Sequence, residues 1–111
     1  MESVVRAALR DAERAFAEAR TAKLDADGRD PGLCGFARIV AYRVKPWLRG
    51  TLKRLGEAES DGKGAWYIDG LTGSPSGFGV RANTAACDAA CRILRQRLGD
   101  HDEFYVQSFL D

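Results

Sequence analysis

In the last quarter of the chain, the spacing of apolar residues changes from that of a helix to that of a strand, so this region requires one element of each kind. Residues 85–98 carry apolar side chains at helical spacing. The stripe consists of Cys87, Cys91, Leu94 and Leu98. We predict that Asn83 or Thr84 caps this helix and that Gly99 ends it. Residues 104–110 then alternate between two faces, which is typical of a strand. The chain therefore mixes helix and sheet.

The N-terminal region predicts a helix over residues 3–24, because apolar side chains recur there on one face. This stripe is thin and rich in alanine, so it predicts close packing against a partner element. The next segment also fits the helical template, but Pro46 removes one backbone hydrogen bond from it. We predict two helices, residues 31–44 and 46–57, or one kinked helix. A strand over residues 36–44 is the competing interpretation, since this stretch is rich in Ile, Val and Tyr.

The middle of the chain predicts a β-hairpin. Residues 57–64 form a polar loop, and residues 65–71 and 78–82 are predicted strands on either side of a turn. The second of these strands, the helix after it and the strand over 104–110 could form a crossover with parallel strands. The predicted fold is α+β, with a small, mostly antiparallel sheet of about three strands packed against N-terminal helices and one C-terminal helix.

Length and cysteine usage limit the class of protein. The 111 residues predict a single compact domain, residues 1–111. No apolar run is long enough for a membrane span, and no apolar segment near the start suggests a secretory signal. Three cysteines without a signal peptide indicate free thiols in a reducing compartment. We expect a cytoplasmic protein, for which a homo-oligomer is possible.

Charge is divided into blocks that the net value of +1 conceals. Residues 31–56 hold six cations and no acid, namely Arg38, Arg43, Lys45, Arg49, Lys53 and Arg54. A second patch in the C-terminal helix consists of Arg92, Arg95 and Arg97. Either these cations face an acidic partner, or the acidic residues 98–111 neutralise them within the fold. We predict that they face outward and form a partner-binding surface.

The sequence gives little support to metal binding or catalysis. A four-ligand zinc set would need Cys34, Cys87, Cys91 and His101. Their spacing matches no usual structural zinc pattern, so the paired cysteines are predicted to be core residues. His101 is the only histidine and would have to serve as any imidazole base. Residues 77–82 fit Gly-x-Gly-x-x-Ala, but the chain is too short for a dinucleotide-binding sheet. We predict no enzyme, no cofactor and no metal.

Three functions follow from these observations. The leading hypothesis is a non-enzymatic module that binds a larger protein or ribonucleoprotein complex with an acidic surface, as an inhibitor or adaptor. Small single domains of this kind are typical of inhibitors that phages and mobile elements carry against bacterial defence complexes. The alternative is a nucleic-acid-binding module that uses the basic segment 36–54, where Phe36, Tyr42 and Trp47 are interleaved with cations. In the competing interpretation Phe36 and Trp47 belong to the core and only the cations are exposed. The third is an unidentified enzyme centred on His101.

Overall fold

The computed structural model describes residues 2–26, 35–56, 58–68, 80–98 and 104–110. In chain order its elements are α1 (Glu2–Ala26), β1 (Gly35–Tyr42), α2 (Pro46–Leu55), β2 (Glu59–Ser60), β3 (Ala65–Tyr67), α3 (Val80–Leu98) and β4 (Phe104–Leu110). The described helices and the four-stranded antiparallel sheet make the chain α+β, as predicted, with one strand more than expected. None of the described helices is long and apolar enough to cross a membrane.

The strands lie in the order β2-β3-β1-β4, and every neighbouring pair is antiparallel. Both β3 and β4 therefore run opposite to β1, which lies between them. Strands β3 and β4 are thus parallel to each other, and α3 connects them across β1. In the same way, α2 connects β1 to the parallel strand β2 across β3. From β1 onward the connectivity is that of the split βαβ motif.

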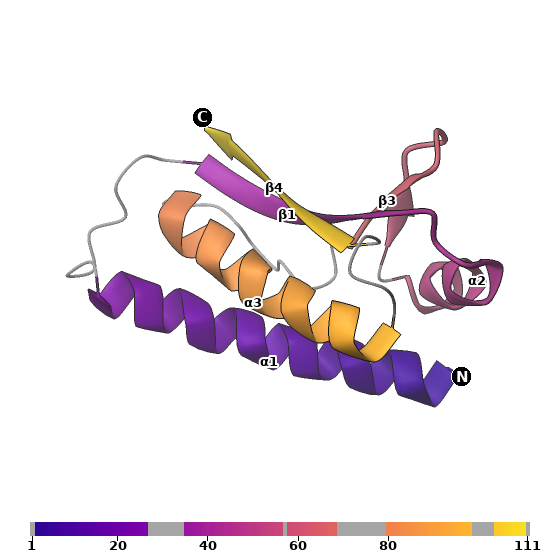
Figure 1. Cartoon of the computed structure of the whole chain (residues 1–111), viewed down its shortest axis with the longest axis horizontal. Helices are drawn as coiled ribbons and strands as arrows, with labels where there is room; N and C mark the ends of the chain where they lie inside the picture. The colour runs from indigo at the N-terminus through magenta and orange to yellow at the C-terminus, as the bar shows by residue number, and fades with distance from the viewer. Residues whose placement is uncertain (1, 27–34, 57, 69–79, 99–103, 111) are drawn as a thin grey trace.

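The molecule has three layers, because α3 lies between the sheet and α1 (Figure 1). A helix that is covered on two sides needs small side chains to let both neighbours approach. Buried Ala82, Ala86 and Ala90 supply them in α3, and buried Ala8 and Ala12 supply them in α1. The predicted close packing of the alanine-rich N-terminal helix is thus confirmed.

The core lies on both sides of α3, between α3 and one face of the sheet and between α3 and α1. The sheet contributes buried Ile39 and Phe104, and α3 contributes buried Leu94. Leu48 and Leu52 of α2 extend the same cluster beyond the end of β1. We call this face of the sheet the helix-covered face. Its side chains come from Ala37, Ile39, Ala41, Trp66, Phe104 and Val106.

The predicted helix over residues 31–44 is wrong, and the competing strand is correct. Residues 35–42 form β1 instead, while residues 31–34 lie outside the described part of the chain. Ile39 and Val40 are both fully buried although they point to opposite faces. A central strand that is apolar on both faces shows no alternation, so its apolar content also fits a helical template. The helix predicted after Pro46 is confirmed as α2.

The predicted hairpin over residues 65–82 is also wrong in its second half. Strand β3 pairs with β2 and β1, and β2 comes from the segment predicted as a polar loop. Residues 80–82 belong to α3, which begins before its predicted caps, so Asn83 is a buried position within the helix. The crossover therefore starts from β3 rather than from residues 78–82, of which 78 and 79 lie outside the described residues.

Candidate functional site

The sheet has one face that none of the described helices covers, and we call it the open face (Figure 1). Residues directly opposite each other on paired strands point to the same face. The register places Val40 of β1 opposite Tyr67 of β3 and opposite Tyr105 of β4. The open face carries Arg38, Val40, Tyr42, Glu59, Ala65, Tyr67, Tyr105 and Gln107.

Three tyrosines and one arginine surround Val40 on the open face. Tyr42 and Tyr105 are each 39% exposed, and their ring centroids lie 5.7 Å apart. The guanidinium carbon of Arg38 lies 3.7 Å from the centroid of the Tyr67 ring, which is a cation–π contact. The face therefore presents aromatic rings and a guanidinium group, whereas the side chains of the helix-covered face belong to the apolar core or pack against it.

The cations predicted in the basic segment lie at and beyond the end of β1. Arg43, Lys45, Arg49, Lys53 and Arg54 are exposed, and Arg38 is half-buried against Tyr67. Helix α2 contains no acidic residue, so its surface keeps one sign of charge. The acids that could have neutralised this segment, at positions 100, 102, 103 and 111, lie outside the described residues.

The second predicted patch, on α3, is largely engaged within the fold. Arg95 donates from Nε and Nη2 to the carbonyl oxygen of Phe104, at 2.9 and 2.6 Å. The Nη1 atom of Arg97 lies 2.9 Å from Oδ2 of Asp11 in α1. Arg92 is exposed. Two of the three arginines thus link α3 to its neighbours, so we centre the candidate site on the open face and the basic segment.

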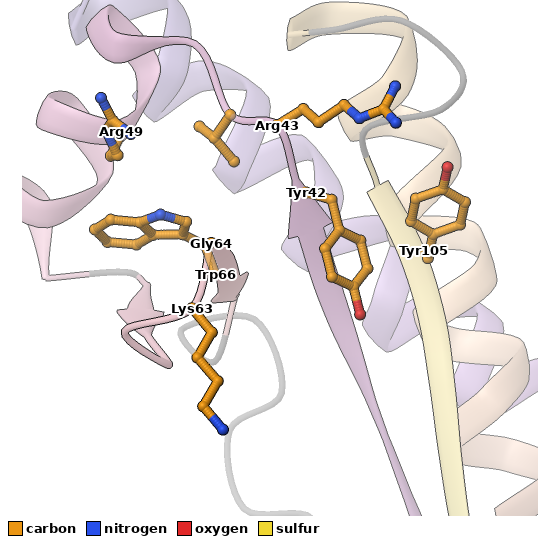
Figure 2. Close-up of a pocket in the computed structure, with 8 residues that line it drawn as sticks. Tyr42, Arg43, Arg49, Lys63, Gly64, Trp66 and Tyr105 are labelled. Carbon is orange, nitrogen blue, oxygen red and sulfur yellow. The ribbon is translucent and has the colours of Figure 1, made fainter.

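A cavity of about 780 Å³ opens where β1 ends, between α2 and the turn from β2 to β3 (Figure 2). We call it the end pocket. Its lining residues are Tyr42, Arg43, Val44, Arg49, Lys63, Gly64, Trp66 and Tyr105. Among these described residues there are cations from three separate segments and no acid. Tyr42 and Tyr105 belong to the open face as well, so the two surfaces are continuous.

Hydrogen bonds within the turn from β2 to β3 order the backbone at Lys63. The Oδ1 atom of Asp61 accepts hydrogen bonds from the backbone N–H groups of Lys63, at 2.6 Å, and Ala65, at 3.0 Å. Gly62 and Gly64 adopt φ values of +78° and +99°, which L side chains rarely tolerate. The sequence Asp-Gly-Lys-Gly thus folds into an ordered turn with its lysine on the side of the end pocket.

Arg43 has an unusual backbone conformation for its residue type. Its φ of +54° is in the left-handed region, and among the described non-glycine residues it alone has a positive φ. This conformation costs about 1–2 kcal/mol in a residue with a side chain. Figure 2 shows Arg43 extending from the end of β1 toward the Tyr105 side of the end pocket. Strained backbone of this kind is concentrated at functional sites.

The thiols of α3 are structural groups. Cys87 and Cys91 are free and buried. Burial, with a smaller effect from the charge of Asp88, raises the pKa of Cys87 to about 12, and burial also raises the pKa of Cys91. Since the thiolate is the nucleophile and the metal ligand, these groups are inert near neutral pH. No three metal-ligating side chains cluster among the described residues. Cys34 and His101 lie outside them.

Sequence reasoning missed Lys63, Trp66, Tyr67 and Tyr105 as site residues. The alternation over residues 104–110 predicts that Tyr105 and Phe104 point to opposite faces of the sheet, but it does not indicate which of the two faces is left uncovered by helices. Trp47 is 37% exposed on α2, so it is not a core residue, while the side chain of Phe36 is not described.

Comparison of the chain with protein-family models, with curated proteins and with solved structures finds no match. The open face and the end pocket are therefore the features of this chain that indicate a function.

Proposed function

We propose that the protein binds a single strand of RNA or DNA on the open face of its sheet. The observation that carries this proposal is the group of Tyr42, Tyr67, Tyr105 and Arg38 around Val40. Bases stack on aromatic rings and on guanidinium planes whatever their sequence, because every base has a flat π face. A four-stranded sheet that displays aromatic side chains on one face is a known way to hold unpaired bases.

The spacing of the tyrosines favours a single strand over a duplex. Tyr67 and Tyr105 lie on strands to either side of β1, so their backbones are separated by roughly 10 Å, twice the distance between neighbouring strands. The Tyr105 ring and the Arg38 guanidinium that lies over Tyr67 can therefore stack on different bases, provided that the bases are not already paired and stacked in a duplex. The protein should discriminate against double-stranded nucleic acid for this reason.

The cations at the end of β1 supply the electrostatic part of the binding. Arg43, Lys45, Arg49 and Lys53 are exposed and can contact phosphates as the strand leaves the sheet. Each phosphate that a cation neutralises releases counterions. For a single strand, each such contact therefore contributes about −0.7 to the slope of the logarithm of the binding constant against the logarithm of the salt concentration. Four such contacts predict a slope of roughly −3.

Fluorescence anisotropy with labelled mixed-sequence RNA and DNA oligomers tests the proposal. We expect binding at low salt that weakens log-linearly as salt is added, with competition by unlabelled single strands and little competition by duplex. Absence of binding to every oligomer at low salt, or equal competition by duplex, would contradict the proposal.

Binding of a protein partner, as an inhibitor or adaptor of a larger complex, is the second candidate. The observation that favours it is Trp47, which is 37% exposed on α2 among cations. Tryptophan and arginine are the residue types most often found at the energetic centre of protein interfaces. Charge reversal at Arg38, Arg43 and Arg49 should abolish capture of such a partner, and capture by the triple variant would refute this surface as its docking site.

A further inference from the structure

We propose that the end pocket holds a terminal phosphate of the bound strand, a phosphomonoester next to the last base. This inference rests on the proposed function, because it assigns the end of the strand that the open face would bind. The end pocket would make the protein prefer a strand with a phosphorylated end over a strand with a hydroxyl end. Stacking on tyrosines alone produces no such preference.

The charge in the end pocket supports a phosphomonoester over an internal phosphodiester. Arg43, Arg49 and Lys63 line one cavity although they come from the turn after β1, from α2 and from the turn before β3. A phosphomonoester carries close to two negative charges near neutral pH, whereas a diester carries one. Figure 2 shows the charged ends of these side chains on different sides of the cavity, so a phosphate group contacts one or two of them, and the positive potential of all three favours the more highly charged group.

The start of α2 adds to the positive potential near the end pocket. Helix α2 begins at Pro46, soon after Val44, a lining residue. Its first turn has no acidic residue, and its N-cap, Lys45, makes no capping hydrogen bond. The partial positive charge of a helix N-terminus is therefore not offset by a side chain of this turn. This effect is smaller than that of the three cations and adds to it.

The aromatic residues of the end pocket explain why a base would accompany the phosphate. Figure 2 shows Trp66 on one side of the pocket with Arg49 and Lys63, and Tyr42 with Tyr105 on the other. Tyr42 and Tyr105 continue onto the open face, so a strand stacked there leads into the cavity. The volume of about 780 Å³ lies within the range of sites that take small organic ligands, and a terminal nucleotide is of that size.

The first experiment compares three oligomers of one sequence that end in a 5′-phosphate, in a 3′-phosphate or in hydroxyl groups alone. Each competes with a labelled hydroxyl-ended strand, followed by fluorescence anisotropy. We expect one phosphorylated oligomer to bind about tenfold more tightly than the hydroxyl-ended one, since one or two charge-assisted hydrogen bonds supply a factor of this size. Equal affinities for all three oligomers would overturn the pocket assignment and leave the proposed function intact.

Two variants assign the preference to the end pocket. Lys63→Ala should reduce the preference for the phosphorylated end several-fold and change the affinity for the hydroxyl-ended strand far less. Arg49→Ala should reduce the preference by a similar factor and should weaken binding of the hydroxyl-ended strand only as much as loss of one strand cation does. Lys53→Ala is the matched control, because Lys53 is an exposed α2 cation that does not line the pocket. A preference that survives the Arg49→Ala, Lys63→Ala double variant would overturn the assignment.

A titration with free nucleoside 5′-monophosphate and 3′-monophosphate separates a strand end from a free nucleotide. Trp66 fluorescence reports on the pocket, in a Trp47→Phe background because the chain has two tryptophans. We expect binding of the free nucleotide to be at least tenfold weaker than that of the phosphorylated strand, which gains the stacking of further bases. Free nucleotide that binds as tightly as the strand would overturn the strand-end proposal. Nucleotide binding without any strand binding would contradict both this inference and the proposed function.

Discussion

The helix-covered face and the open face of the sheet use neighbouring residues for different purposes. On β4, Phe104 points into the core and is 1% exposed, whereas Tyr105 points to the open face and is 39% exposed. On β1, Ile39 meets the core cluster, whereas Arg38 stacks on Tyr67. The difference teaches that the main apolar core lies on one face, whereas the other face presents aromatic and cationic groups that a ligand can contact.

The arginines of α3 and α2 differ in a similar way, since two of those in α3 bind groups of the protein and those of α2 are exposed. In α3, Arg95 and Arg97 bind groups of the protein itself, the Phe104 carbonyl and the Asp11 carboxylate. In α2, Arg49 is exposed and lines the end pocket. Residue type alone therefore does not identify a binding cation, and the position of the helix in the fold decides which role an arginine takes.

The largest expected effect is on stability and tests the contrast within β4. Phe104→Ala should lower the free energy of unfolding by about 3–5 kcal/mol, because it removes a buried aromatic ring and leaves a cavity. Tyr105→Ala should lower it by less than about 1 kcal/mol, as is usual for a surface position. Urea denaturation followed by circular dichroism measures both. Similar losses in the two variants would show that the two faces do not differ as we describe.

The next effect is on binding and tests the open face. Tyr42→Ala and Tyr105→Ala should each weaken binding to a hydroxyl-ended single strand by about 1–3 kcal/mol, which is the contribution of one stacked base. Arg92→Ala is the control, because Arg92 is an exposed residue of α3, the helix that packs on the other face of the sheet. Anisotropy titrations at one fixed salt concentration make the comparison. An Arg92→Ala loss equal to that of the tyrosine variants would indicate general electrostatic attraction instead of stacking.

The two α3 arginines should differ from each other by a smaller amount. Arg95→Ala removes two hydrogen bonds to a carbonyl oxygen next to the buried Phe104 ring and should lower the free energy of unfolding by about 1–2 kcal/mol. Arg97→Ala breaks an ion pair whose Arg97 side chain is 48% exposed, so its effect should stay below about 1 kcal/mol. Thermal and urea denaturation of the two variants in parallel provide the test, and a reversed order would contradict the structural role of Arg95.

The last effect is absent near neutral pH and appears only at high pH. The pKa of Cys87 is about 12 in the folded protein, against an ordinary value of 9.0, because the buried thiolate is disfavoured. The unfolded chain thus releases a proton first, so the free energy of unfolding falls as the pH rises from about 9 to 12 and is unaffected below that window. Cys87→Ala should show a shallower fall between these pH values. Identical pH profiles for the two proteins would mean that the thiol is not held neutral.

The helices and the last strand could be predicted from sequence because each has a clear period. The regions around α1, α2 and β4 were located correctly, and α3 was located except for its start. Strand β1 was ambiguous because Ile39 and Val40 are buried on opposite faces, and β2 was missed because it is a polar strand of two residues.

The site was only half predictable for a different reason. The basic segment is a local feature of composition, so Arg43 and Arg49 could be named in advance. The open face is created by long-range pairing, which places Tyr67 and Tyr105 on either side of Val40. No local pattern reports that register, nor which face of the sheet the helices leave uncovered.

Photochemical cross-linking tests the central claim most directly. A single-stranded oligomer with a photoreactive base is bound at low salt and irradiated, and the attached residues are identified by mass spectrometry. We predict adducts on Tyr42, Tyr67 or Tyr105, which are lost when unlabelled single strand competes. Adducts confined to α1 and α3, with none on the open face, would contradict the account.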